Sequence, residues 1–179
     1  MNTKNSFVNK YGRDVFSQNG EDGIIEEAIR RINPPKVACE FGANNGECFS
    51  NTANLKGWER QLFDVESTNI HVVIAKITPE NVNAYVLQKL GLLSIDIDGN
   101  DYIVWRAYKG MVDIVIIEIN SGIPLSDYTI SEVYGTGYSP MKLLGNEKGY
   151  FLLCHTGNMI FILNKHKHLF ADADETFAL

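Results

Sequence analysis

Cysteine is scarce in this sequence, and so are clustered basic residues and long apolar runs. Among the 179 residues there are three cysteines, Cys39, Cys48 and Cys154, and none lies at C-x-x-C spacing from another. An odd number of cysteines behind a polar N-terminus without a signal-peptide core favours reduced thiols and a cytoplasmic location. No apolar run approaches the ~18 residues of a membrane helix, so we expect no membrane association.

Positive charge is also in short supply. Lysine and arginine number 16 against 22 acids, the net charge is −6, and no stretch gathers five basic residues. Proteins that hold nucleic acid through its phosphates present a basic face, so we expect no nucleic-acid partner. The composition, 45% hydrophobic and 21% charged, is ordinary for a globular protein, and the length fits one domain over residues 1–179.

The stretch Val37–Glu47, VACEFGANNGE, is the segment around which the rest can be arranged. Its apolar start is typical of a buried strand, and Gly42 and Gly46 follow with two asparagines between them. A strand that leads into a glycine-rich turn and a helix lets a nucleotide-like ligand approach the backbone. The spacing G-x-x-x-G is not the dinucleotide pattern G-x-G-x-x-G. By itself the G-x-x-x-G spacing also fits a strand-to-helix turn that needs glycine for its backbone conformation and binds no ligand.

Hydrophobic periodicity and turn residues predict alternating helices and strands. The expected helices are 24–32, 49–55, one capped by Thr78-Pro79-Glu80 that continues to Leu90, 102–108 and 139–147. The expected strands are 37–39, 61–65, 71–75, 92–97, 112–119, 150–155 and 159–163. Residues 1–16 are expected to form an N-terminal arm, and residues 164–179 a loose polar tail.

This alternation predicts an α/β protein with a mostly parallel sheet, helices on both faces and a closing antiparallel hairpin. The strand 112–119 is the most apolar and is expected in the middle of the sheet. Only Ser67–Ile70 separate the second strand from the third, which is too short for a crossover helix.

Several segments in this order resemble S-adenosylmethionine-dependent methyltransferases, and more narrowly bacterial FkbM-type methyltransferase domains. The resemblance covers about residues 10–163. The segments that carry it are SQNGEDGIIEE, CEFGANNGECFSNT, KGWERQLFDVE, ITPENVN, LLSIDIDGNDYIVWRA and VDIVIIEIN. It implies a Rossmann-like methyltransferase sandwich that binds S-adenosylmethionine.

The resemblance also implies roles for the matching residues of the first two strands. The methionine part of the cofactor would lie on the turn after the first strand, at Glu40, Gly42, Asn44 and Gly46. A carboxylate at the end of the second strand would accept hydrogen bonds from the ribose hydroxyls. Asp64 is the first candidate for that carboxylate and Glu66 the second, because strand ends are uncertain by a few residues.

Further matching residues would border the reacting methyl group. Asp96 and Asp98 would lie beside the adenosyl group, and alternation along an extended strand would point both the same way. Asp98 is the first candidate for the base that takes the acceptor's proton, and Glu118 the second. Asp98 could instead cap the helix that follows. Another matching group would lie at the cofactor's entrance: Gln18, Glu21 and Asp22.

Two features depart from the resemblance or leave an alternative. The helix that usually walls the adenine between the second and third strands is missing. The irregular segment Ser121–Thr136, with Tyr128 and Tyr134, is the candidate lid. A divalent cation held by Asp96 or Asp98, with Glu118 and Asn120, is an alternative use of the acids, although the EF-hand pattern fails.

The remaining histidines and tryptophans are expected to be structural. His71 begins a strand at the end of the sheet away from the site, and His155 lies on the closing hairpin, remote from the cofactor. Trp58 and Trp105 are expected in the core.

These observations predict an enzyme that methylates a hydroxyl group of a sugar or small metabolite. The reaction would be an in-line displacement at a sulfonium. The alternative is a degenerate methyltransferase-like domain that serves as a non-catalytic binding or assembly module. The missing helix after Asp64 favours this alternative.

Overall fold

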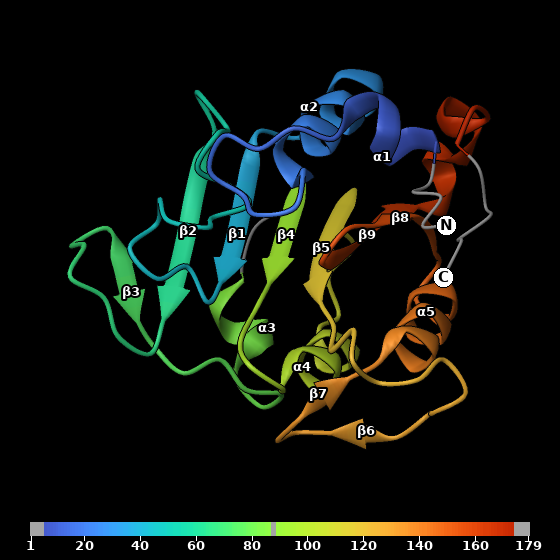
Figure 1. Cartoon of the computed structure of the whole chain (residues 1–179). Coiled ribbons are helices and arrows are strands. Elements are labelled where there is room, and N and C mark those ends of the chain that lie inside the picture. The colour runs from blue at the N-terminus through green and yellow to red at the C-terminus, as the bar shows by residue number, and fades with distance from the viewer. Residues whose placement is uncertain (1–5, 87–88, 174–179) are drawn as a thin grey trace.

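A seven-stranded sheet runs through the protein, whose computed structural model describes residues 6–86 and 89–173 (Figure 1). Its strands are β1 (Val37–Phe41), β2 (Glu59–Asp64), β3 (Val72–Ile74), β4 (Leu92–Ile95), β5 (Ile114–Glu118), β8 (Tyr150–His155) and β9 (Asn158–Leu163). They lie in the order β3-β2-β1-β4-β5-β9-β8. The first five are parallel, while β9 runs antiparallel to β5 and to β8. The predicted α/β class, mostly parallel sheet and closing hairpin are confirmed.

Helices cover both faces of the sheet, as Figure 1 shows. On one face lie α1 (Ser6–Tyr11) and α2 (Glu21–Ile32), and on the other lie α3 (Val82–Tyr85), α4 (Asp101–Ala107) and α5 (Tyr138–Glu147). Side chains alternate along each strand. Leu92 therefore packs toward the first layer, formed by α1 and α2, and Leu93 toward the second layer, formed by α3, α4 and α5. Trp105 of α4 is fully buried in the second layer, as predicted.

The order of the strands reverses beside β1. The chain moves outward from β1 through β2 to β3, and then returns to form β4 on the other side of β1. Ligands of open α/β sheets bind outside the carboxyl ends of the strands at such a reversal. This topology predicts a ligand site outside the carboxyl ends of β1 and β4, beside the turn that contains Gly42 and Gly46.

The link between β2 and β3 makes a parallel connection without a helix. Leu62 pairs with Val72 and Asp64 pairs with Ile74. From the end of β2 at Asp64, the chain therefore has to run back along β2 by only two residues before β3 begins. That distance is about 7 Å at the rise of a strand, which the link at residues 65–71 spans as an open loop. The expectation of a helix-free link is confirmed.

The two ends of the described chain are more ordered than predicted. Residues 1–16 were expected as an arm, but α1 buries Phe7 and Val8 against the first layer. The polar segment 164–179 was expected to be loose, but Asn164–Phe170 forms a 3-10 helix, η1, whose Phe170 is buried. The Nε2 atom of His166 in this helix lies 2.8 Å from the Oδ1 atom of Asp113, just before β5.

Two predicted helices differ from the structure. Residues 49–55 form turns, because the Ser50 and Thr52 hydroxyls bind the buried Glu40 and Phe49 has φ 58. The helix after Thr78 begins only after Asn81 and is four residues long. Its predicted continuation reaches residues 87–88, which lie outside the described part of the chain.

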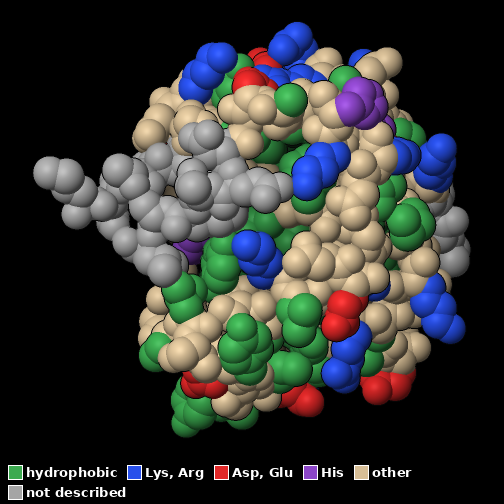
Figure 2. Space-filling view, turned by 90° about the vertical axis from the view of Figure 1, so that its right-hand side faces the viewer, with side chains coloured by type: hydrophobic (Ala, Val, Ile, Leu, Met, Phe, Trp, Pro, Cys, Tyr) green, Lys and Arg blue, Asp and Glu red, His purple; other side chains and the backbone are tan. Residues whose placement is uncertain are grey.

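The candidate lid contains a small hairpin, β6 (Ile130–Ser131) and β7 (Gly135–Thr136), which forms a separate antiparallel sheet. On the face seen in Figure 2, lysine and arginine side chains are scattered among other residues. Within residues 6–86 and 89–173, no helix is both long enough and apolar enough to cross a membrane.

Candidate functional site

The glycine turn follows β1 directly and touches β4. Gly42 has φ 78 and Gly46 has φ 77, a conformation that glycine adopts without strain. The amides of Gly42 and Ala43 both donate to the Phe63 carbonyl oxygen, at 2.9 and 3.0 Å. A Cβ atom on Gly42 would overlap the carbonyl oxygen of Asp96. Only glycine therefore allows the turn and the end of β4 to lie this close.

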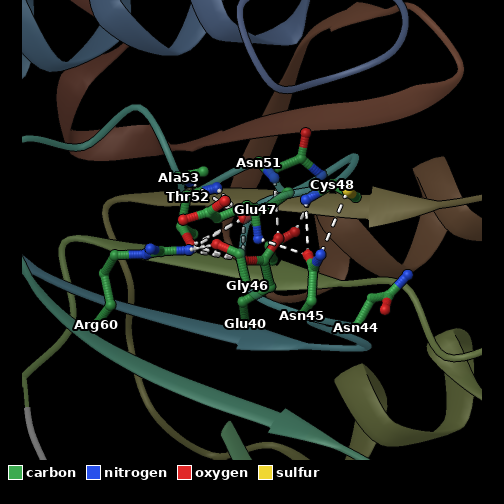
Figure 3. Close-up of polar contacts among 12 residues, drawn as sticks. Glu40, Asn44, Asn45, Gly46, Glu47, Cys48, Asn51, Thr52, Ala53 and Arg60 are labelled. Atoms are coloured by element: carbon green, nitrogen blue, oxygen red, sulfur yellow. Dashed lines mark hydrogen bonds and ion pairs between the residues drawn. The ribbon is translucent and has the colours of Figure 1, made fainter. Parts of the chain in front are cut away.

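Glu40 holds the segment that follows the turn (Figure 3). Its carboxylate is 3% exposed and accepts hydrogen bonds from the Ser50 hydroxyl at 2.6 Å, the Thr52 hydroxyl at 2.5 Å and the Asn51 amide at 2.9 Å. Arg60 lies 3.8 Å away. Burial raises the pKa of Glu40, against the opposing effect of these donors. Glu40 lines neither cavity described below, so its contacts support the turn from behind.

Glu40→Gln should lower the free energy of unfolding by about 1.5–3 kcal/mol, the range for hydrogen bonds to a charged group. Glutamine keeps the shape, but its NH2 group cannot accept the hydrogen bonds that the carboxylate oxygen accepts. Urea unfolding measures the change. The control is Glu147→Gln at the exposed end of α5. Equal stability of the two variants would contradict the supporting role of Glu40.

A cavity of about 430 Å³, called the first cavity, opens at the carboxyl ends of β1 to β4. Seven of the residues singled out in the sequence line it: Gln18, Gly42, Asn44, Asp64, Glu66, Asp96 and Asp98. The strand β2 ends at Asp64, one residue before the predicted end. The Asp64 carboxylate accepts the Asn44 amide at 2.6 Å and the Glu66 amide at 3.3 Å. These bonds hold an acid at the edge of the cavity, beside the glycine turn.

A second cavity of about 600 Å³ adjoins the first. Gln18, Asp96 and Asp98 line both cavities, and Glu118 lines the second cavity only. The lid hairpin also contributes, because Tyr134 lines the second cavity. The two spaces therefore meet at a junction made mainly of acids.

Asp96 and Glu118 share a hydrogen bond between their carboxyl groups. Burial, followed by the charge of Asp96, raises the pKa of Glu118 to about 8. Burial also raises the pKa of Asp96. The pair therefore holds one proton at neutral pH, as two carboxyl groups in one site commonly do.

The residues after β4 turn sharply instead of extending the strand. The predicted strand 92–97 ends at Ile95, and Asp98 has φ 52, so the expected alignment of Asp96 with Asp98 along an extended strand is wrong. Asp101 accepts the amides of Ile97 and Gly99 at 2.9 and 3.1 Å. These bonds close the turn at the start of α4, and burial raises the pKa of Asp101 to about 6. Sequence reasoning missed this role, although an acid in the first turn of a helix was its signal.

The segment before α2 is fixed by two buried acids and carries Gln18 to the junction. Asp22 is 2% exposed and accepts the three amides of residues 15–17 at 2.7–2.8 Å. Glu21 is fully buried and accepts the Thr156 hydroxyl at 2.7 Å. Glu21 lines neither cavity, so it anchors this segment to the hairpin of β8 and β9.

The histidines lie differently from one another. His71 is exposed just before β3, at the end of that strand away from the cavities. His155 lies closer to the site than expected, because its Nε2 is 3.5 Å from the hydroxyl of Ser121, which lines the second cavity. Burial lowers the pKa of His155.

A metal centre has no support in the described geometry. Across residues 6–86 and 89–173, no three His, Cys, Asp or Glu side chains are placed to hold one ion. The carboxyl group of Glu118 is instead hydrogen-bonded to Asp96.

Comparison with known proteins adds no assignment. No protein-family model matches the chain, and no curated protein matches it.

Proposed function

We propose that the protein is an S-adenosylmethionine-dependent methyltransferase with a Rossmann-like fold, which methylates a hydroxyl group of a sugar or another small molecule. One observation carries the proposal: the two cavities meet at Asp96 and Asp98. The first cavity lies at the reversal of strand order, where α/β sheets bind nucleotide-like ligands. The second cavity gives an acceptor access to the same junction.

The lining of the first cavity fits the cofactor. S-adenosylmethionine would supply an electrophilic methyl group on a positively charged sulfur. Gly42 lines this cavity and lets the turn pack against the end of β4, because a β-carbon there would overlap the Asp96 carbonyl oxygen. Asp64 or Glu66 offers carboxylate oxygens for ribose hydroxyls, and Asp96 and Asp98 offer negative charge for the sulfonium.

The residues at the junction would orient the reactants and receive a proton. Transfer of a methyl group to a hydroxyl depends mainly on holding the two reacting atoms in line. The carboxyl pair of Asp96 and Glu118 borders the second cavity, where it is placed to take the proton that the hydroxyl loses. Gln18 lines both cavities and is placed to hold either reactant by hydrogen bonds.

Asp64→Ala should weaken binding of S-adenosylmethionine by about 1.5–3 kcal/mol, the range for hydrogen bonds to a charged group. Glu66→Ala should have a smaller effect, because β2 ends at Asp64 and the Asn44 amide fixes the Asp64 carboxylate. Isothermal titration calorimetry on the two variants measures the difference. A larger loss for Glu66→Ala would make Glu66 the ribose ligand.

Binding of the cationic cofactor should release a proton and strengthen as pH rises toward 8. The folded pKa of Glu118 is raised to about 8, so the free protein holds this proton below that pH. A positive charge beside the pair favours the ionised form. The stability of the free protein should change with pH in the opposite direction to its affinity for the cofactor. Because the pKa of Glu118 is raised in the folded state, its contribution to the free energy of unfolding is present at low pH and is lost as pH rises toward 8.

Calorimetry in buffers of different ionisation enthalpy measures the released proton. Glu118→Gln should remove the pH dependence of cofactor affinity. S-adenosylhomocysteine, which lacks the sulfonium charge, should show less pH dependence than the cofactor. If cofactor affinity depends on pH equally in the wild type and in Glu118→Gln, the released proton does not come from Glu118.

The open link between β2 and β3 favours a second candidate, a non-catalytic binding module. The link leaves Val65 and Ile70 63% and 91% exposed, where related folds place a helix over the adenine side. A thermal-shift assay with S-adenosylmethionine and S-adenosylhomocysteine separates the two candidates, because a ligand of the folded state raises the melting temperature. No shift with either ligand at millimolar concentration would favour the module.

A further inference from the structure

The charged side chains that line the second cavity are all acidic. Its lining includes the carboxyl groups of Asp96, Asp98 and Glu118, and among residues 6–86 and 89–173 no lysine, arginine or histidine lines it. The first cavity differs, because Lys76 is part of its lining. A ligand that carries phosphate or carboxylate groups would meet like charge in the second cavity without a compensating cation, which opposes binding.

Asp98 is the acid of this cavity that is available to a ligand. Asp96 and Glu118 are hydrogen-bonded to each other and hold one proton. The side chain of Asp98 is exposed. Within residues 6–86 and 89–173, its carboxylate accepts no hydrogen bond and forms no ion pair. A positively charged group in the cavity would therefore find its partner at Asp98.

An aromatic residue also lines the second cavity. Tyr134 lines it and is 75% exposed. The hairpin that carries the ring is held in place, because the Asn120 side chain donates to the Tyr134 carbonyl oxygen at 2.7 Å and the Tyr134 amide donates to the Ser131 hydroxyl at 3.0 Å. An aromatic face near a carboxylate is a recognised way to bind an organic cation.

We propose that the second cavity selects a small molecule with a protonated amine, such as an amino sugar or an amino alcohol. The ammonium group would pair with Asp98 beside the ring of Tyr134. This inference rests on the proposed function only in naming the ligand as the methyl acceptor. The preference for a cation follows from the lining of the cavity.

A titration of the 15N-labelled full chain with three matched sugars tests the preference. The probes are D-glucosamine, D-glucose and D-glucose 6-phosphate, and the reporters are the amides of Gly99, Gly135 and Gly157 in the cavity. Glucosamine should bind ~10-fold or more tightly than glucose, the effect of one hydrogen bond to a charged group. Glucose 6-phosphate should bind more weakly than glucose.

Asp98→Asn should remove most of the preference for glucosamine, and Tyr134→Leu should reduce it. The control is Glu132→Gln, which removes an exposed acid of the same segment that does not line the cavity. Equal affinity for glucosamine and glucose, tighter binding of the phosphate, or no shift of the three amides at millimolar glucosamine would overturn the proposal. A thermal shift with S-adenosylmethionine in the same sample would leave the proposed function standing in each case.

Discussion

Gly42→Ala should abolish cofactor binding and destabilise the fold. A β-carbon at this position would overlap the carbonyl oxygen of Asp96, so β1 and β4 would have to separate at the site. In addition, φ 78 costs a residue with a side chain about 1–2 kcal/mol. The loss of stability should exceed that conformational cost, because the overlap is with backbone and cannot be relieved by a rotamer change.

Gly57→Ala provides a matched control. Gly57 has φ 76, almost the same as Gly42, but a β-carbon there would meet no atom within 4 Å. It should therefore show only the conformational cost and retain cofactor binding. Urea unfolding and calorimetric titration with S-adenosylmethionine compare the two variants. If Gly42→Ala behaves like Gly57→Ala in both measurements, close approach at Gly42 is not essential to the site.

Glu118→Gln should slow methyl transfer by about 10²–10⁴-fold, the usual effect of losing a general base. Glutamine keeps the shape and the contact with Asp96 but cannot take a proton. The raised pKa of Glu118 brings its proton affinity close to physiological pH, where a base is most effective. A bound sulfonium would drive off the shared proton and leave the pair ionised when the acceptor arrives.

Asp98→Asn tests the other candidate base in the same assay. Asparagine tolerates the left-handed conformation of this residue, and the turn is closed by Asp101, so the backbone should be unaffected. Its effect on a single-turnover rate with an identified acceptor should be smaller than that of Glu118→Gln. Near-normal turnover by Glu118→Gln together with a large loss in Asp98→Asn would make Asp98 the base.

The sheet was predictable because most of its strands contain an apolar run bounded by turn residues. The segment at β5 is the clearest example, since Ile114–Ile117 are fully buried and β5 lies inside the sheet, between β4 and β9. The missed features depend on distant contacts. Residues 50–52 form turns because the Ser50 and Thr52 hydroxyls and the Asn51 amide donate to Glu40, ten or more positions earlier. Polar side chains that bind in this way compete with helix formation, and local periodicity does not reveal it.

The site was predictable at the glycine turn and at Asp64, where a motif lies directly at the end of a strand. Sequence reasoning did not pair Asp96 with Glu118, because alternation along one strand placed Asp96 with Asp98. The register supplies the correct pair: Ile95 is opposite Ile117, so the next residues, Asp96 and Glu118, lie side by side on neighbouring parallel strands. Two adjacent strands that each end in an acid were the signal.

A crystal structure of the protein with S-adenosylhomocysteine would decide whether the first cavity holds the cofactor. We expect the ligand along Gly42 and Asn44, with its ribose on Asp64 and its sulfur directed toward Asp96 and the second cavity. A ligand bound elsewhere, or a first cavity that stays empty at saturating ligand concentration, would contradict the proposed function.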